Sequence, residues 1–163
     1  MKQFSQKYTI VQLLEDMSEG DEYAASGWPL HVTLADIFAI DWDESTLISR
    51  CFETFSKFKS VRATVGDEDW LGEDEQTHVT LLNMNAELFN LHIDIIKFLE
   101  QGNVRFNTPE FIEQGFKPHL TVRPNARLRK GRTVAFDVLT VIDMFPNNDP
   151  SRRKVLKTIK LAD

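Results

Sequence analysis

The chain has 163 residues, of which 42% are hydrophobic and 27% charged, and its net charge at pH 7 is −6. This size and composition fit one globular domain, and no apolar run reaches the roughly 20 residues that a membrane-spanning helix needs. An acidic chain is not expected to coat long duplex nucleic acid, and the polar residues within MKQFSQKYTIVQLLEDM do not indicate export. We therefore expect a monomeric, soluble, cytoplasmic protein without membrane association.

The charge is unevenly distributed along the chain. Residues 1–114 carry 8 Lys/Arg against 21 Asp/Glu, a net charge of −13, whereas residues 115–163 carry 11 against 4, a net charge of +7. A basic C-terminal third suits a local anionic ligand better than a long polyanion. Cys51 is the only cysteine, so an internal disulfide and a cysteine metal cluster are excluded, and we expect a buried core thiol.

Hydrophobic periodicity predicts two helices. The first covers Ser45–Phe58 with Asp43 or Ser45 as its N-cap, and the second follows the N-cap Asn85 and stops at Gly102. Seven segments have strand character: Tyr8–Leu14, Leu30–Phe38, Ser60–Val65, Thr77–Leu82, His119–Arg123, Thr133–Phe145 and Lys154–Leu161.

The order of these elements is strand, strand, helix, strand, strand, helix and three strands. It favours an α+β fold of two related halves over a parallel βαβ sheet. The strands at 60–65 and 77–82 should form a hairpin around the acidic turn region at 66–75. The prediction is therefore a single domain, residues 1–163, of two pseudo-symmetric lobes, each an antiparallel sheet with a packed helix.

Three tripeptides share the pattern His-x-Thr, and each lies in a strand-like segment. They are His31-Val32-Thr33, His78-Val79-Thr80 and His119-Leu120-Thr121. Because side chains alternate across a strand, the imidazole and the hydroxyl of each motif point to the same face.

Such a pair places a proton-transfer group beside a hydrogen-bond donor. Phosphodiester hydrolysis without a metal needs a base, an acid and donors for the non-bridging oxygens, and two facing motifs would supply all three. Histidine suits both proton transfers because its ordinary pKa is about 6.5. Zinc ligation by the three histidines is the alternative, but the motifs lack the acidic or thiolate partners that usually complete such a site.

The chain resembles the 2H phosphoesterase superfamily, which includes 2′-5′ RNA ligase-like proteins and RNA cyclic phosphodiesterases. The matching stretches are His31-Val32-Thr33-Leu34 and Phe116-Lys117-Pro118-His119-Leu120-Thr121-Val122. The resemblance implies a bilobal α+β fold, catalysis by His31, Thr33, His119 and Thr121, and no metal or organic cofactor. It also implies a substrate with a 2′,3′-cyclic phosphate, or a 2′,5′-linked or cyclic oligonucleotide.

The third motif requires a choice of pair. His31 and His119 are separated by a helix, a hairpin and a second helix, as two lobes imply, whereas His78 lies within the hairpin. We therefore predict that His78 is a sheet residue with a satisfied hydrogen bond, the alternative being that His78 or Thr80 lines the cleft.

Three further residues are candidates for substrate binding. Arg123 continues the alternation of His119 and Thr121 and could clamp a phosphate, although an ion pair at the strand end is equally compatible. Trp28 and Phe116 border the motifs and could stack on a base, although each could instead be core. A basic loop follows at Arg127, Arg129, Lys130 and Arg132, which we interpret as solvated surface charge.

The predicted function is hydrolysis of a phosphodiester in a cyclic nucleotide or short oligonucleotide. The alternative is a non-catalytic module that binds a nucleotide or a protein on the same fold, because a fold alone does not prove activity.

Overall fold

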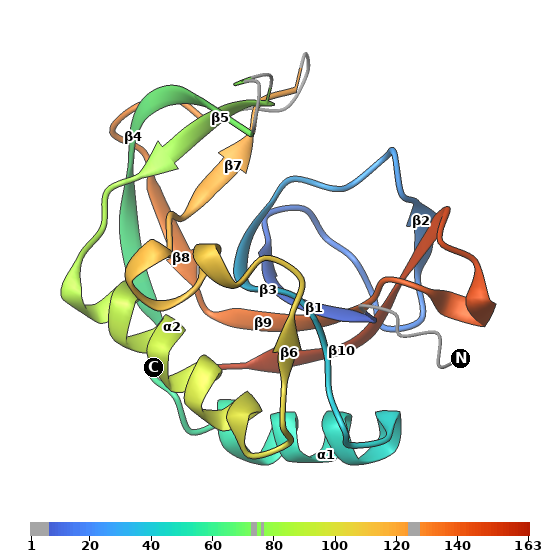
Figure 1. The fold of residues 1–163 in the computed structure, drawn as a ribbon. Coiled ribbons are helices and arrows are strands. Elements are labelled where there is room, and N and C mark those ends of the chain that lie inside the picture. Colours follow the sequence, from blue (N-terminus) through green and yellow to red (C-terminus); the bar gives the residue numbers. More distant parts are fainter. Residues whose placement is uncertain (1–6, 73–74, 76, 124–127) are drawn as a thin grey trace.

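A computed structural model of the chain describes residues 7–72, 75, 77–123 and 128–163. Two α-helices and ten strands are formed by this part of the chain (Figure 1). The helices are α1 (Glu44–Phe55) and α2 (Ala86–Glu100). The strands are β1 (Tyr8–Leu13), β2 (Glu22–Ala24), β3 (His31–Ala39), β4 (Val61–Leu71), β5 (Thr77–Leu82), β6 (Arg105–Phe106), β7 (His119–Thr121), β8 (Thr133–Phe136), β9 (Val138–Asp143) and β10 (Arg152–Lys160). Short 3-10 turns cover Pro109–Phe111, Glu113–Gly115 and Pro146–Asn148.

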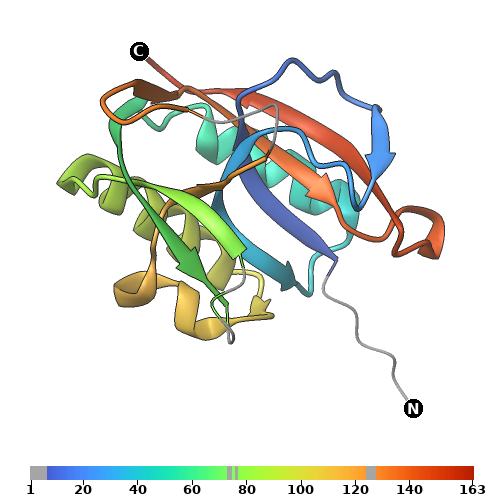
Figure 2. The same ribbon diagram turned by 90° about the horizontal axis from the view of Figure 1, so that it is seen from above.

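The strands form two antiparallel sheets. The larger has the order β2-β10-β9-β1-β3-β6, and the smaller has the order β7-β5-β4-β8. Figure 2 shows the blue and red strands of the larger sheet beside the green strands β4 and β5 of the smaller one. Both helices lie at the lower side of the molecule in Figure 1. The α+β, bilobal prediction is confirmed.

Local sequence signals explain where the helices begin. The Asp43 side chain accepts a hydrogen bond from the Thr46 amide at 2.8 Å, and Asn85 does the same for the Leu88 amide at 2.8 Å. Each bond satisfies an N–H that has no partner inside its helix. Helix α1 ends three residues earlier than predicted, and Cys51 on its inner face is fully buried. Burial raises the pKa of this thiol, as expected for an inert core cysteine.

The strand predictions need two corrections and two additions. The first predicted hairpin strand continues to Leu71, because a bulge between Val65 and Glu68 lets pairing with β5 resume through residues expected to turn. The segment predicted as one strand, 133–145, divides at Asp137 into β8 and β9, which belong to different sheets. Strands β2 and β6 are three and two residues long, too short for a periodic pattern.

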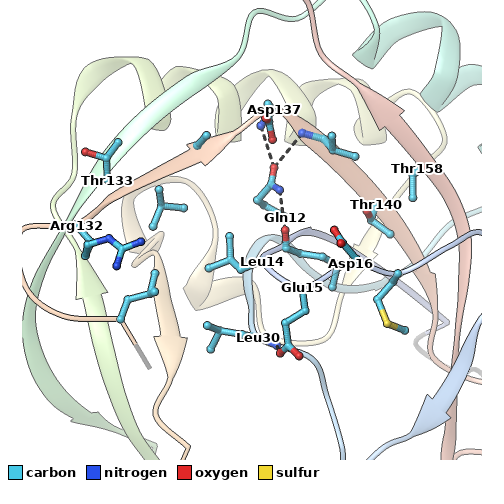
Figure 3. A pocket seen from close by; sticks show the side chains of 16 residues that line it. Gln12, Leu14, Glu15, Asp16, Leu30, Arg132, Thr133, Asp137, Thr140 and Thr158 are labelled. Atoms are coloured by element: carbon cyan, nitrogen blue, oxygen red, sulfur yellow. Dashed lines mark hydrogen bonds between the residues drawn. The ribbon is translucent and has the colours of Figure 1, made fainter. Parts of the chain in front are cut away.

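The Gln12 side chain binds the backbone where the chain passes from β8 in the smaller sheet to β9 in the larger one. Its Oε1 accepts hydrogen bonds from the amides of Asp137 at 2.9 Å and Val138 at 3.0 Å, and its Nε2 donates to the Leu13 carbonyl at 2.8 Å. Figure 3 shows these bonds at the centre of a polar cavity of about 570 Å³ that lies beside β1, β8 and β9. The Gln12 side chain therefore supplies an acceptor to two backbone amides where the chain leaves β8 and enters β9.

Replacing Gln12 with leucine is expected to lower the free energy of unfolding by about 1–3 kcal/mol, because two amides lose their acceptor. Urea unfolding followed by circular dichroism measures the change. The matched control is Gln114→Leu, at an exposed position, which should stay within about 0.5 kcal/mol of the parent. Equal stability of both variants would contradict this role of Gln12.

The main core fills the space between the helices and the two sheets. Its largest fully buried side chains include Phe38, Phe55 and Phe136, from β3, α1 and β8. A smaller cluster of Val11, Ile142, Met144 and Val155 packs with Tyr23 and Trp28, among others. Within the described residues, no helix is both long and apolar enough to cross a membrane.

Candidate active site

The first motif lies on β3, with its two polar side chains on the same face. Val32 and Leu34 are buried in the main core, whereas His31 and Thr33 between them are partly exposed. The alternation predicted from the sequence is therefore present, and it presents the imidazole and hydroxyl away from the core.

The second motif lies on β7 and has the same arrangement. Leu120 is buried in the main core, and the flanking His119 and Thr121 are accessible. Strand β7 is held by pairing with β5, where His119 is opposite Leu81 and Thr121 is opposite Val79.

The two motifs line two pockets on the adjacent strands β3 and β7, and we refer to these pockets together as the two halves of one cleft. The half that we call the Arg123 half, about 350 Å³, is lined by His31, Thr121, Trp28 and Arg123 among others. The half that we call the Phe111 half, about 440 Å³, is lined by Thr33, Leu34, Asp36, Leu71, His92, Glu110, Phe111, Gly115, Phe116, Lys117 and His119. Each half thus combines the histidine of one motif with the threonine of the other.

Both histidine rings are anchored through the same nitrogen. His31 Nδ1 lies 2.8 Å from the Pro29 carbonyl, and His119 Nδ1 lies 2.7 Å from the Lys117 carbonyl. Since a carbonyl only accepts hydrogen bonds, Nδ1 carries the proton in each ring. Nε2 is then the nitrogen left for proton transfer, as a base when the ring is neutral and as an acid when it is charged.

The cleft lowers the pKa of both rings. For His31 burial is the main cause, and the charges of His119 and Arg123 lower the pKa further, against the opposing effect of the bond to Pro29. For His119 burial is again the main cause, and the Lys117 charge adds to it. The effect of His119 and Arg123 on the His31 pKa indicates that these two side chains lie close enough to His31 to act on its charge.

The three predicted substrate-binding residues also line this cleft. Arg123 and Trp28 belong to the Arg123 half, where the Trp28 ring lies 4.5 Å from the His31 ring between centroids. Phe116 belongs to the Phe111 half but is largely buried, since its ring stacks on His92 at 3.8 Å. Its position suits support of the cleft wall better than an exposed platform.

His92 is a site residue that the sequence did not reveal, because nothing in its helix distinguished it from a surface or packing histidine. It is 1% exposed, and its Nδ1 lies 2.7 Å from the Leu34 carbonyl. Its Nε2 accepts a hydrogen bond from the Glu113 amide at 2.9 Å. The ring therefore joins β3, which carries the first motif, to the turn that precedes the second.

The third motif faces away from this cleft. Thr80 is opposite Leu120 in the pairing of β5 with β7, so His78 and Thr80 share the face of Leu120 and not that of His119. His78 Nε2 lies 2.8 Å from Glu68, and its ring stacks on Trp70 at 4.4 Å. The expected satisfied hydrogen bond is present, and neither residue is among those lining the cleft.

Two residues of the basic loop, Lys130 and Arg132, are not among those that line the cleft. Lys130 pairs with Asp67 at 2.7 Å near the surface, and Arg132 lines the large cavity of Figure 3 instead of the cleft. Arg127 lies outside the described residues. Among the residues that are described, no group of three or more His, Cys, Asp or Glu side chains could hold a metal ion.

Comparison with solved structures finds the same fold across nearly the whole chain. A crystal structure described as a phosphoesterase is 16% identical, with a TM-score of 0.61 and coverage of 97% of this chain and 99% of that one. TT0787 of Thermus thermophilus is 12% identical, with a TM-score of 0.59 and coverage of 94% and 97%. LigT of E. coli in complex with 3′-AMP is 15% identical, with a TM-score of 0.55 and coverage of 96% and 98%. At such identities these matches establish the fold alone.

Comparison at the level of sequence identifies the family. No curated protein matches the chain. The family model of the 2′-5′ RNA ligase superfamily matches residues 6–142, a segment that includes both motifs of the cleft. The chain therefore belongs to the 2′-5′ RNA ligase superfamily of 2H phosphoesterases.

Proposed function

We propose that the protein is a phosphodiesterase that hydrolyses a 2′,3′-cyclic phosphate, or a 2′,5′-linked or cyclic oligonucleotide, without a metal or organic cofactor. The observation that carries the proposal is the pairing of His31 with Thr121 and of Thr33 with His119 in the two halves of one cleft. A phosphoryl group between the strands would meet a proton-transfer group and a hydroxyl donor on either side.

The proposed reaction uses the two Nε2 atoms in opposite roles. The neutral ring takes a proton from the attacking water as the new P–O bond forms, and the charged ring gives a proton to the leaving oxygen as the other P–O bond breaks. Thr33 and Thr121 would donate hydrogen bonds to the non-bridging oxygens, and the Arg123 guanidinium would balance the developing negative charge.

A nucleotide substrate is supported by what related folds have bound. LigT of E. coli was crystallised with 3′-AMP, with ATP and with NADP⁺. The acidic body of this chain favours a short or cyclic nucleotide over long RNA, because binding of a long polyanion depends on many Lys/Arg contacts. We propose that it acts as a cytoplasmic monomer.

The pH dependence of kcat/KM tests the two-histidine assignment. Reaction needs one neutral and one charged ring, so the profile should be a bell between the two apparent pKa values of the free enzyme. Because both pKa values are lowered from the ordinary value, the optimum should lie below about pH 6.5. Initial rates with adenosine 2′,3′-cyclic phosphate and with a 2′,5′-linked diadenosine measure it.

The same assay distinguishes the alternatives. Activity should survive EDTA, and its loss would favour a metal-dependent reaction. If the protein turns over no 2′,3′-cyclic nucleotide, no 2′,5′-linked oligonucleotide and no cyclic dinucleotide, the enzymatic proposal is overturned in favour of a binding module.

A further inference from the structure

The two halves of the cleft carry opposite charges. The Arg123 half contains one arginine and no carboxylate among its lining residues, and the Arg153 guanidinium lies 5.9 Å from the Trp28 ring that borders it. The Phe111 half contains Asp36 and Glu110, and its one lysine, Lys117, lies 3.4 Å from Asp69. A phosphate would therefore be attracted to the first half and repelled from the second.

The Phe111 half also has an apolar wall. Leu71, Phe111 and Phe116 contribute to it, and the Phe111 ring is 52% exposed although it borders a cavity. Phe116 is already covered by His92, so Phe111 is the ring that a ligand could reach. Exposed aromatic rings at a nucleotide site act as stacking platforms for bases.

Asp36 supplies a hydrogen-bond acceptor in the lining of this half. Its Oδ2 accepts a hydrogen bond from the Thr108 amide at 2.7 Å, which fixes the carboxylate in place. The Ile37 amide and the Thr108 side chain also hydrogen-bond to Asp36, and a carboxylate with about four acceptor positions still has capacity for a ligand. The side chain is half-buried, and burial raises its pKa against the opposing effect of hydrogen bonds from Thr108 and Ile37.

We propose that the Phe111 half binds an amine-bearing nucleobase and the Arg123 half binds the phosphate-bearing arm of the same diester. The inference rests on the proposed function and narrows its substrate to a diester between two nucleosides. The base would stack on Phe111, and its exocyclic amine would donate to Asp36 or Glu110, as carboxylates accept from base amines elsewhere. A 2′,3′-cyclic mononucleotide would leave one half empty.

A set of three 2′,5′-linked dinucleotides tests this arrangement. The parent is 2′,5′-linked diadenosine with a 5′-phosphate on its first adenosine. Because the 5′-phosphate should bind in the Arg123 half, the second adenosine should occupy the Phe111 half. In the other two, purine riboside, which lacks the amine, replaces either the first or the second adenosine. We expect the second replacement to lower kcat/KM about tenfold or more, and the first to lower it less than about twofold.

Substitutions in the Phe111 half test which residues produce the preference for adenine over purine at the second position. Glu110→Gln and Asp36→Asn should reduce the preference for adenine at the second position, while Glu100→Gln, an exposed control on α2, should keep it. Phe111→Ala should lower kcat/KM for the parent about tenfold, and Phe52→Ala, whose ring is 51% exposed on α1, should not.

The outcomes separate this inference from the function on which it rests. Turnover of adenosine 2′,3′-cyclic phosphate without turnover of the dinucleotides would overturn the base site and leave the phosphodiesterase intact. Equal sensitivity at both positions would also overturn it. If no diester is turned over, calorimetric binding of the parent dinucleotide decides, since it should weaken about tenfold in Phe111→Ala and not in Phe52→Ala.

Discussion

Replacing His119 with alanine is expected to lower kcat by about 10²–10⁴-fold, and His31→Ala should do the same, because each removes one of two proton transfers. Binding should persist, since the threonines and Arg123 remain. Rapid-quench turnover with a 2′,5′-linked diadenosine gives kcat, and calorimetry gives the affinity of each variant.

The double variant sharpens this expectation. When two groups act as a unit in catalysis, the first substitution removes most of the rate enhancement that they provide together. The kcat of the double variant His31→Ala/His119→Ala should therefore be only slightly lower than that of either single variant. The matched control is His78→Ala, which has the same sequence pattern on the opposite face of β7 and β5 and should keep turnover within about twofold. Loss of turnover in His78→Ala, with His31→Ala active, would mean that the wrong pair has been assigned.

Replacing His92 with phenylalanine is expected to lower the free energy of unfolding by about 2–4 kcal/mol at pH 7.5. The aromatic stack on Phe116 would be kept, but the Leu34 carbonyl would lose its donor and the Glu113 amide its acceptor. Urea unfolding measures the loss. His78→Phe, at a histidine whose hydrogen bond is exposed, should cost less than about 1 kcal/mol.

The contribution of His92 should also depend on pH. Its native contacts need a neutral ring, and burial lowers its pKa in the folded chain below the unfolded value of about 6.5. Between these two pKa values the unfolded chain binds more protons, so stability is complete above about pH 6.5 and falls as the pH drops towards the folded pKa.

His31 and His119 have lowered pKa values as well and act in the same direction. His92→Phe should therefore lose stability less steeply than the parent between about pH 7 and 5, without becoming independent of pH. An unchanged slope would show that His92 does not titrate on unfolding.

Sequence patterns predicted the features that depend on neighbouring residues. Alternation along the strands oriented His31, Thr33, His119 and Thr121, and the caps at Asp43 and Asn85 marked both helix starts. The choice of His31 and His119 over His78 followed from element order, and the register of β5 with β7 agrees with the expectation for His78. The catalytic roles of the four motif residues stay predictions.

Features that depend on distant residues could not be predicted in this way. At the division of β8 from β9, the Asp137 amide donates to Gln12, which is more than a hundred residues away in sequence. The Phe111 half depends on Leu71, Glu110 and Phe116, which only the tertiary fold brings to one cavity. His92 acquired its role from two backbone groups outside its own helix.

The interleaving of strands between the sheets bears on how the chain can come apart. The larger sheet takes its strands from both ends of the chain and includes β6 from the middle, while the smaller takes β4, β5, β7 and β8 from between. A cut after α2 would remove strands from both sheets at once, so neither of its two fragments retains a complete sheet. We therefore expect the two halves of the cleft to form and to be lost together in one cooperative folding transition. The distance between the two motifs should then be fixed by the fold and not vary through a hinge motion.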